Sequence, residues 1–168
     1  MVVKRAFLAH IPGDPNSDYL RAVLPLAPAL READAAVLPR LTAETAGPLL
    51  DALTLGKPVF LPAESLPETL TRPLAVGLSQ LTGQGLAVCP LTGLPSWVQT
   101  GVSCPALLTY ERLKTLAAQG IDRIYLAARP AATPLAVTAA KTWNIHLTGG
   151  IDAGTGQSHR LGVVYPEK

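Results

Sequence analysis

"ADAAVLPRLTAETAGPLLDALTLGKPVFLP", residues 33–62, contains the pattern that decides the fold. Residues 34–39 form a short apolar run that ends in a proline, and residues 57–62 form a second one. Between them, residues 42–56 carry apolar side chains at helical spacing, with Thr42 as the expected N-cap and a glycine as the stop. A strand, a helix and a second strand in this order predict a parallel βαβ unit.

The same alternation continues on both sides of this stretch. Ser17, Thr109 and Thr133 are the expected N-caps of three further helices, and Pro25 and Pro28 predict a break in the first of them. The last two predicted strands, at 145–150 and 161–166, flank a glycine-rich turn and are expected to form a hairpin. Further strands are predicted at 4–11, 86–91, 123–128, 145–150 and 161–166, and further helices at 17–33, 65–85, 110–120 and 133–144.

This alternation predicts an α/β fold. We expect a Rossmann-like three-layer sandwich, with a mostly parallel sheet, helices on both faces and a small C-terminal α/β extension. Residues 92–106 are rich in Gly, Pro, Ser and Thr and are expected to be a loop. The loop predicts a boundary between a domain of residues 1–91 and an extension of residues 107–168. The alternative is that the two parts form one continuous domain.

The composition excludes several classes of function. The chain has 168 residues and is 48% hydrophobic, enough for a real core. Its net charge of +2, the lack of a Lys/Arg run and 5% aromatic residues argue against nucleic-acid binding. No stretch approaches the ~18 apolar residues of a membrane span. Only 15% of the residues are charged, against roughly 25% in typical domains, which indicates a surface partly covered by a partner.

No motif for metal binding or hydrolysis is present. Cys89 and Cys104 lack C-x-x-C spacing, and His10, His146 and His159 are scattered, so no metal site is expected. Both cysteines are expected to be reduced thiols of a cytoplasmic protein. The chain contains neither a Walker pattern nor G-x-S-x-G. The sequence therefore identifies no catalytic residue, and it leaves open whether the protein is an enzyme.

The turn inside the quoted stretch carries more polar side chains than a plain connection needs. Ligands of open α/β sheets bind at the carboxyl ends of the strands, where this turn lies. For a phosphate-bearing ligand, Gly13 would allow close approach of the backbone, and the hydroxyls of Ser17 and Thr42 could donate to phosphate oxygens. Thr45 could bond a ring carbonyl, whereas a carboxylate at Glu44 would repel an anion. The alternative is that Ser17 and Thr42 only cap helices.

Two segments resemble known families. Residues 33–62 resemble the central stretch of the homo-oligomeric flavin-containing cysteine decarboxylases, the phosphopantothenoylcysteine decarboxylase-like flavoproteins. That family has a proline at the end of a strand, a turn ending in Asn-Thr, a helix and a "G-[KR]-P-V" strand, which Pro39, Thr45 and "GKPVF" (56–60) match. Residues 108–147 resemble a module found in proteins of bacterial microcompartment operons, including their flavoproteins.

The resemblance implies a flavoprotein-like domain that binds FMN at this turn. It also implies a homo-oligomer, microcompartment proteins as partners, and a location in the cytoplasm or a bacterial microcompartment. Glu44 stands where the family has the asparagine that contacts the flavin, and the helix before "GKPV" is shorter. Three readings stay open: a flavin-binding accessory redox protein, a degenerate relative serving as a structural or interaction subunit, and a small α/β enzyme acting on a phosphorylated metabolite. The implied cofactor-binding residues are Gly13, Ser17, Pro39, Thr42, Glu44 and Thr45.

Overall fold

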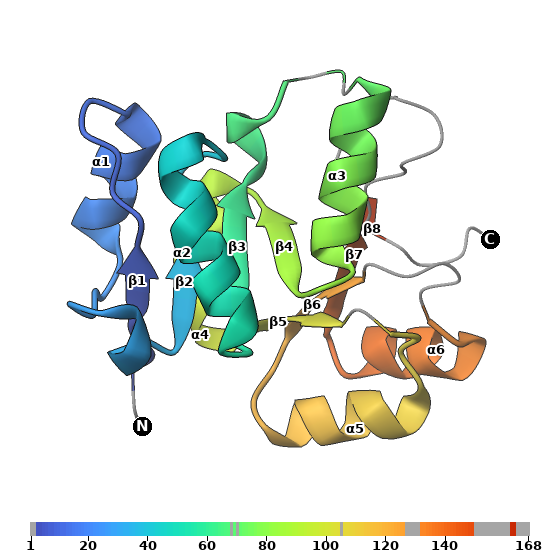
Figure 1. Cartoon of the computed structure of the whole chain (residues 1–168). Coiled ribbons are helices and arrows are strands. Elements are labelled where there is room, and N and C mark those ends of the chain that lie inside the picture. The colour runs from blue at the N-terminus through green and yellow to red at the C-terminus, as the bar shows by residue number, and fades with distance from the viewer. Residues whose placement is uncertain are drawn as a thin grey trace. The chain divides into compact units, whose positions relative to one another are not determined.

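The computed structural model of the chain confirms the α/β fold (Figure 1). It has two sheets of parallel strands connected by helices, and one short strand of the second sheet runs antiparallel. The structure describes residues 3–67, 69, 71–104, 106–126, 132–149 and 162–163. The chain forms two compact units, the first of Met1–Pro67 with Gly85–Gln99 and the second of Glu68–Gln84 with Thr100–Lys168.

The first unit is built on a four-stranded parallel sheet with the strands in chain order. Its strands are β1 (Ala6–Leu8), β2 (Ala35–Val37), β3 (Val59–Pro62) and β4 (Leu86–Cys89). The crossover from β1 to β2 contains α1 (Pro15–Val23) and the 3-10 turn η1 (Leu30–Glu32), and the crossover from β2 to β3 contains α2 (Ala43–Thr54). The 3-10 turn η2 (Ala63–Ser65) follows β3, and η3 (Leu91–Gly93) and α4 (Leu94–Thr100) follow β4.

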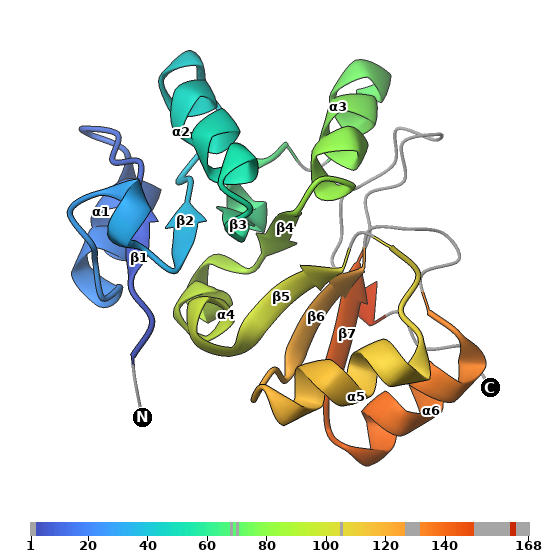
Figure 2. The same ribbon diagram turned by 60° about the horizontal axis from the view of Figure 1, so that its bottom comes forward.

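This sheet lies between two helical layers. Figures 1 and 2 show α2 on one face and α4 on the other. On the α4 face, the ring of Phe60 in β3 lies 6.1 Å from that of Trp97, between centroids and at an interplanar angle of 53°. Every residue of β2, β3 and β4 is buried. Burial on both faces explains why these strands appear in the sequence as continuous apolar runs.

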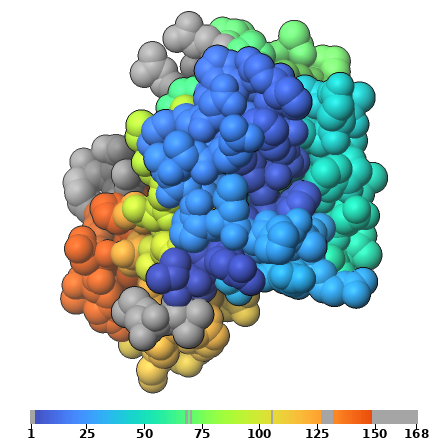
Figure 3. Space-filling model, turned by 90° about the vertical axis from the view of Figure 1, so that its left-hand side faces the viewer, coloured from blue at the N-terminus to red at the C-terminus, as the bar shows by residue number. Residues whose placement is uncertain are grey.

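The chain after α1 covers the outer edge of the sheet. The N–H of Ala6 donates to the carbonyl of Pro25, and the N–H of Ala27 donates to the carbonyl of Ala6, both at 2.9 Å. The break predicted at Pro25 and Pro28 is confirmed, since α1 ends at Val23. In Figure 3 the segment formed by α1 and the residues after it occupies the middle of the face. Pairing along β1 removes an open sheet edge from this side of the unit.

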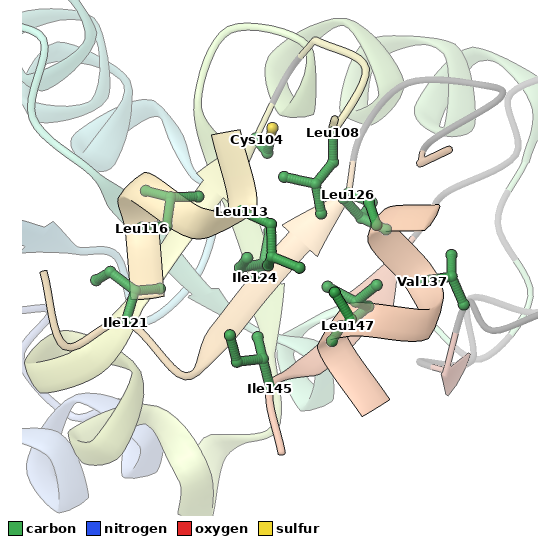
Figure 4. Packing of buried hydrophobic residues seen from close by; sticks show 13 residues of the cluster. Cys104, Leu108, Leu113, Leu116, Ile121, Ile124, Leu126, Val137, Ile145 and Leu147 are labelled. Carbon is green, nitrogen blue, oxygen red and sulfur yellow. The ribbon is translucent and has the colours of Figure 1, made fainter. Parts of the chain in front are cut away.

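The second unit has its own sheet and core. β7 and β8 pair antiparallel, as the predicted hairpin requires, and the other strands pair in parallel. Figure 2 shows α5 and α6 on the same face of this sheet, and Figure 4 shows the apolar cluster beneath them. The elements are α3 (Arg72–Thr82), β5 (Gly101–Cys104), α5 (Tyr110–Ala118), β6 (Arg123–Leu126), α6 (Pro134–Thr142), β7 (His146–Gly149) and β8 (Gly162–Val163).

Three local predictions are wrong. Residues 92–106 are not a loop, because they contain the whole of α4 and of β5. The helix predicted at 65–85 begins at Arg72, because Thr71 is its N-cap and a proline lies in its first turn. The strand predicted at 123–128 is β6, and it belongs to the second sheet instead of extending the first.

Candidate functional site

The turn from β1 into α1 lies at the carboxyl edge of the first sheet. Gly13 has a φ of +82°, a conformation that glycine adopts without strain. A Cβ built on Gly13 would meet no atom within 4 Å, so the backbone conformation of the turn, and not a lack of space, favours glycine here. Asp14, and not Ser17 as predicted, occupies the N-cap position of α1, because the helix begins at Pro15. Proline suits the first helical position, since its ring fixes φ and the missing N–H needs no partner there.

Ser17 is fully buried inside the first turns of α1 and holds the ring of His10. Its hydroxyl oxygen accepts the N–H of Ile11 at 2.9 Å and lies 2.6 Å from Nδ1 of His10. The hydrogen bond between this hydroxyl and Nδ1 runs in the direction that the tautomer of the ring sets, and in both cases it holds the imidazole in place. His10 is exposed, so its oriented ring offers a hydrogen-bonding group at the edge of the sheet.

An ion pair connects the two turns of this edge. Nη2 of Arg40, just after β2, lies 3.3 Å from Oδ1 of Asp14. The guanidinium also donates through Nη1 to the carbonyl of Ser65 at 3.4 Å. The side chain of Asp14 is only 6% exposed, whereas that of Arg40 is 45% exposed. Arg40 is therefore fixed in place and still offers N–H donors to solvent.

The turn from β2 into α2 is organised by Thr45. Thr42 is the N-cap of α2 as predicted, and its N–H donates to the hydroxyl of Thr45 at 2.9 Å. The hydroxyl of Thr45 in turn donates to the carbonyl of Arg40 at 2.7 Å. Thr42 and Thr45 form a capping box, in which Thr45 takes the role usual for Glu or Gln. Thr45 is 1% exposed, and Pro39 before it is also buried.

Glu44 lies on the exposed side of the same first turn of α2. The polar environment of the Thr42 hydroxyl and of its own backbone N–H holds the pKa of Glu44 below its usual range. Its carboxylate is therefore charged at neutral pH. A negative charge is stabilised at a helix N-terminus, so Glu44 occupies the place where an anionic ligand would otherwise gain from α2.

The six residues implied for the cofactor come together in two turns at one edge of the sheet. Gly13 and Ser17 belong to the turn after β1, and Pro39, Thr42, Glu44 and Thr45 belong to the turn after β2. The polar groups that connect and orient these turns were not predicted from the sequence: His10, Asp14 and Arg40. The available signal was their place at the ends of predicted strands: His10 near the end of 4–11, Asp14 in the turn after it, and Arg40 directly after 34–39. Within the described part of the chain, no three His, Cys, Asp or Glu residues cluster in a way that would hold a metal ion.

Comparisons with known proteins add no relative to this picture. No protein-family model, no curated protein and no solved structure matches the chain. In the parts of the chain that the structure describes, no helix has both the length and the apolar character needed to cross a membrane. The resemblance to flavin-containing decarboxylases therefore stays a prediction from the motifs of residues 33–62.

Proposed function

We propose that the protein binds a small phosphate-bearing ligand at the carboxyl edge of β1 and β2, with FMN as the first candidate and an accessory redox role. The observation that supports this most is Arg40, whose guanidinium is held by Asp14 and by the carbonyl of Ser65 while nearly half exposed. Arginine presents planar, paired donors that suit phosphate oxygens. Bound FMN would supply electron transfer, and the chain would supply the anchoring groups.

Two further groups at this edge favour an anionic or polar ligand. The N-terminus of α2, a helix of 12 residues, carries partial positive charge. The ring of His10, held by Ser17, offers an oriented hydrogen-bonding group. Opposing them, Glu44 places a charged carboxylate on the first turn of α2. The balance of these groups predicts weak binding of FMN by the wild-type protein.

Arg40→Gln is expected to weaken the binding of FMN or of inorganic phosphate by about tenfold, because it removes charge-assisted hydrogen bonds to the phosphate. Quenching of flavin fluorescence during titration measures the first affinity, and calorimetry measures the second. The matched control is Arg21→Gln, since Arg21 is an exposed residue in the last turn of α1, far from the turn where that helix begins. Equal losses in both variants would contradict a site at Arg40.

Glu44→Asn is expected to tighten FMN binding by about tenfold, because it removes a like charge near the phosphate and adds an amide. Asp51→Asn is the matched control: it removes the same charge from an exposed position in the last turns of α2, and is expected to change the affinity less than about twofold. The same flavin titration compares the three proteins. Unchanged affinity in Glu44→Asn would mean that the carboxylate points away from the ligand.

The two alternative readings are separated by the same titrations. A subunit that has lost the flavin would bind neither FMN nor phosphate in any of these variants. An enzyme that uses a phosphorylated metabolite would bind phosphate through Arg40 and show no preference for FMN. A homo-oligomer, microcompartment partners and a microcompartment location remain predictions from the sequence.

A further inference from the structure

A cavity of about 650 Å³ opens in the second unit, where β5 ends and α5 begins. Small-molecule sites typically have volumes of about 300–1,000 Å³. The cavity lies at the carboxyl end of a parallel strand, the position where open α/β sheets bind their ligands. It shares no residue with the edge of the first sheet. The residues that line it are Gly83, Cys104, Ala106, Leu107, Thr109 and Arg112.

Among the described residues, the lining combines the cationic side chain of Arg112 with apolar surface. Arg112 is exposed and belongs to the first turn of α5, where its N–H donates to the hydroxyl of the N-cap Thr109 at 3.2 Å. The N-terminus of α5 carries partial positive charge, so it and this guanidinium both attract an anion. Ala106 and Leu107 add exposed apolar surface, with Leu107 42% exposed. Glu111, the acidic residue of the same turn, is not among the described side chains that line the cavity.

The thiol of Cys104 forms part of the wall at the end of β5. Its Sγ lies 3.3 Å from the carbonyl oxygen of Ala106, and Figure 4 shows Cys104 at the margin of the apolar cluster, beside Leu108. Burial raises the pKa of this thiol, while the charge of Arg112 acts in the opposite direction. Both cysteines are buried, with Cys104 3% exposed and Cys89 0% exposed. Cys104 lines the cavity, so it is the thiol that can report on it.

We propose that this cavity binds a small organic anion, whose carboxylate or phosphate pairs with Arg112 and whose apolar part rests on Ala106 and Leu107. Volume, position at the strand end and the cationic side chain of Arg112 beside apolar surface together define this ligand class. The site is separate from the proposed FMN site and uses none of its residues. The two proposals therefore succeed or fail independently.

Disulfide exchange at Cys104 tests the charge preference of the cavity. Two aromatic disulfides are compared, the anionic dithiobis(nitrobenzoate) and the neutral dithiodipyridine. Cys104 loses its proton to solvent, and its sulfur attacks one sulfur of the reagent. The reagent's S–S bond breaks, a mixed disulfide forms and one coloured aromatic thiolate leaves. Cys104→Ala identifies the phase of the reaction that belongs to this residue.

The measured quantity is the rate with the anionic reagent divided by the rate with the neutral one. A change in the pKa of the thiol affects both rates, so the ratio isolates the attraction of the anion. Arg112→Gln is expected to lower this ratio by about fivefold or more, whereas Lys114→Gln, at an exposed position of the same helix, is expected to leave it unchanged. An equal ratio in wild-type protein and Arg112→Gln would overturn the proposal, and so would a Cys104 that reacts with neither reagent.

Competition then distinguishes the acid group. Benzoate and phenyl phosphate are added separately to the reaction of wild-type protein with the neutral reagent. The proposal is supported if either compound slows the reaction of Cys104 with the neutral reagent in wild-type protein but not in Arg112→Gln. The compound that protects Cys104 at the lower concentration identifies the preferred acid group. Failure of both compounds to protect Cys104 would overturn it. None of these outcomes depends on FMN.

Discussion

Leu113→Ala is expected to lower the free energy of unfolding by about 3 kcal/mol. Leu113 is a fully buried residue of α5, and in Figure 4 its side chain lies beside Ile124 of β6. Truncation leaves a cavity between the helix and the sheet, and the packed surroundings close it only in part. Urea denaturation followed by circular dichroism measures the loss.

Leu135→Ala is the matched control for this effect. It makes the same chemical change in α6, the other helix on that face of the sheet, but at a side chain that is 61% exposed. We expect its free energy of unfolding to stay within about 0.5 kcal/mol of the wild-type value. If both variants lost the same stability, α5 would not pack on the second sheet as the structure shows.

Local signals were sufficient to predict α5. Thr109 caps the helix through the N–H of Arg112 at 3.2 Å, and Gly120 ends it with a φ of +83°. Both residues act through contacts within one or two turns, which a sequence displays directly. The same applies to Thr133, whose hydroxyl accepts the N–H of Ala136 at the start of α6. The boundaries of α5 and α6 therefore follow closely from the sequence.

Helix α4 shows where local composition misleads. It has only seven residues and lies in a stretch rich in Gly and Pro, which predicts a loop. Its buried residues Leu94, Trp97 and Val98 nevertheless follow helical spacing, and Pro95 lies in the first turn, where proline is tolerated. The division into two sheets was also missed, because a four-residue apolar strand does not specify which strand it will pair with.

The sequence predicted the two turns of the candidate site but not the side-chain contacts between them. Thr42 and Thr45 interact across three residues, so their positions at the start of α2 could be predicted. The contact between Arg40 and Asp14 joins positions 26 residues apart, on turns that meet only once β1 and β2 pair. Pairs of this kind depend on the register of the sheet, which a single sequence does not specify.

Thr45→Val is expected to lower the free energy of unfolding by about 2 kcal/mol, because it leaves the carbonyl of Arg40 and the N–H of Thr42 without their partner. Valine keeps the volume and branching of the buried side chain, so the change removes the hydroxyl alone. Trp97, buried against Phe60, reports on the first unit. Urea denaturation is followed by its fluorescence, with both proteins carrying Trp143→Phe.

The matched control is Thr54→Val in the same helix. Thr54 is exposed, and its hydroxyl donates at 2.8 Å to the carbonyl of Leu50 one turn earlier, so its loss is expected to cost less than about 0.5 kcal/mol. Equal stability of the two variants would mean that Thr45 does not organise the turn. Flavin titration of folded Thr45→Val then tests whether the proposed ligand depends on this turn. The hydroxyl of Thr45 is buried and donates to the carbonyl of Arg40, so a loss of affinity shows that the turn positions the flavin, and an unchanged affinity shows that it does not.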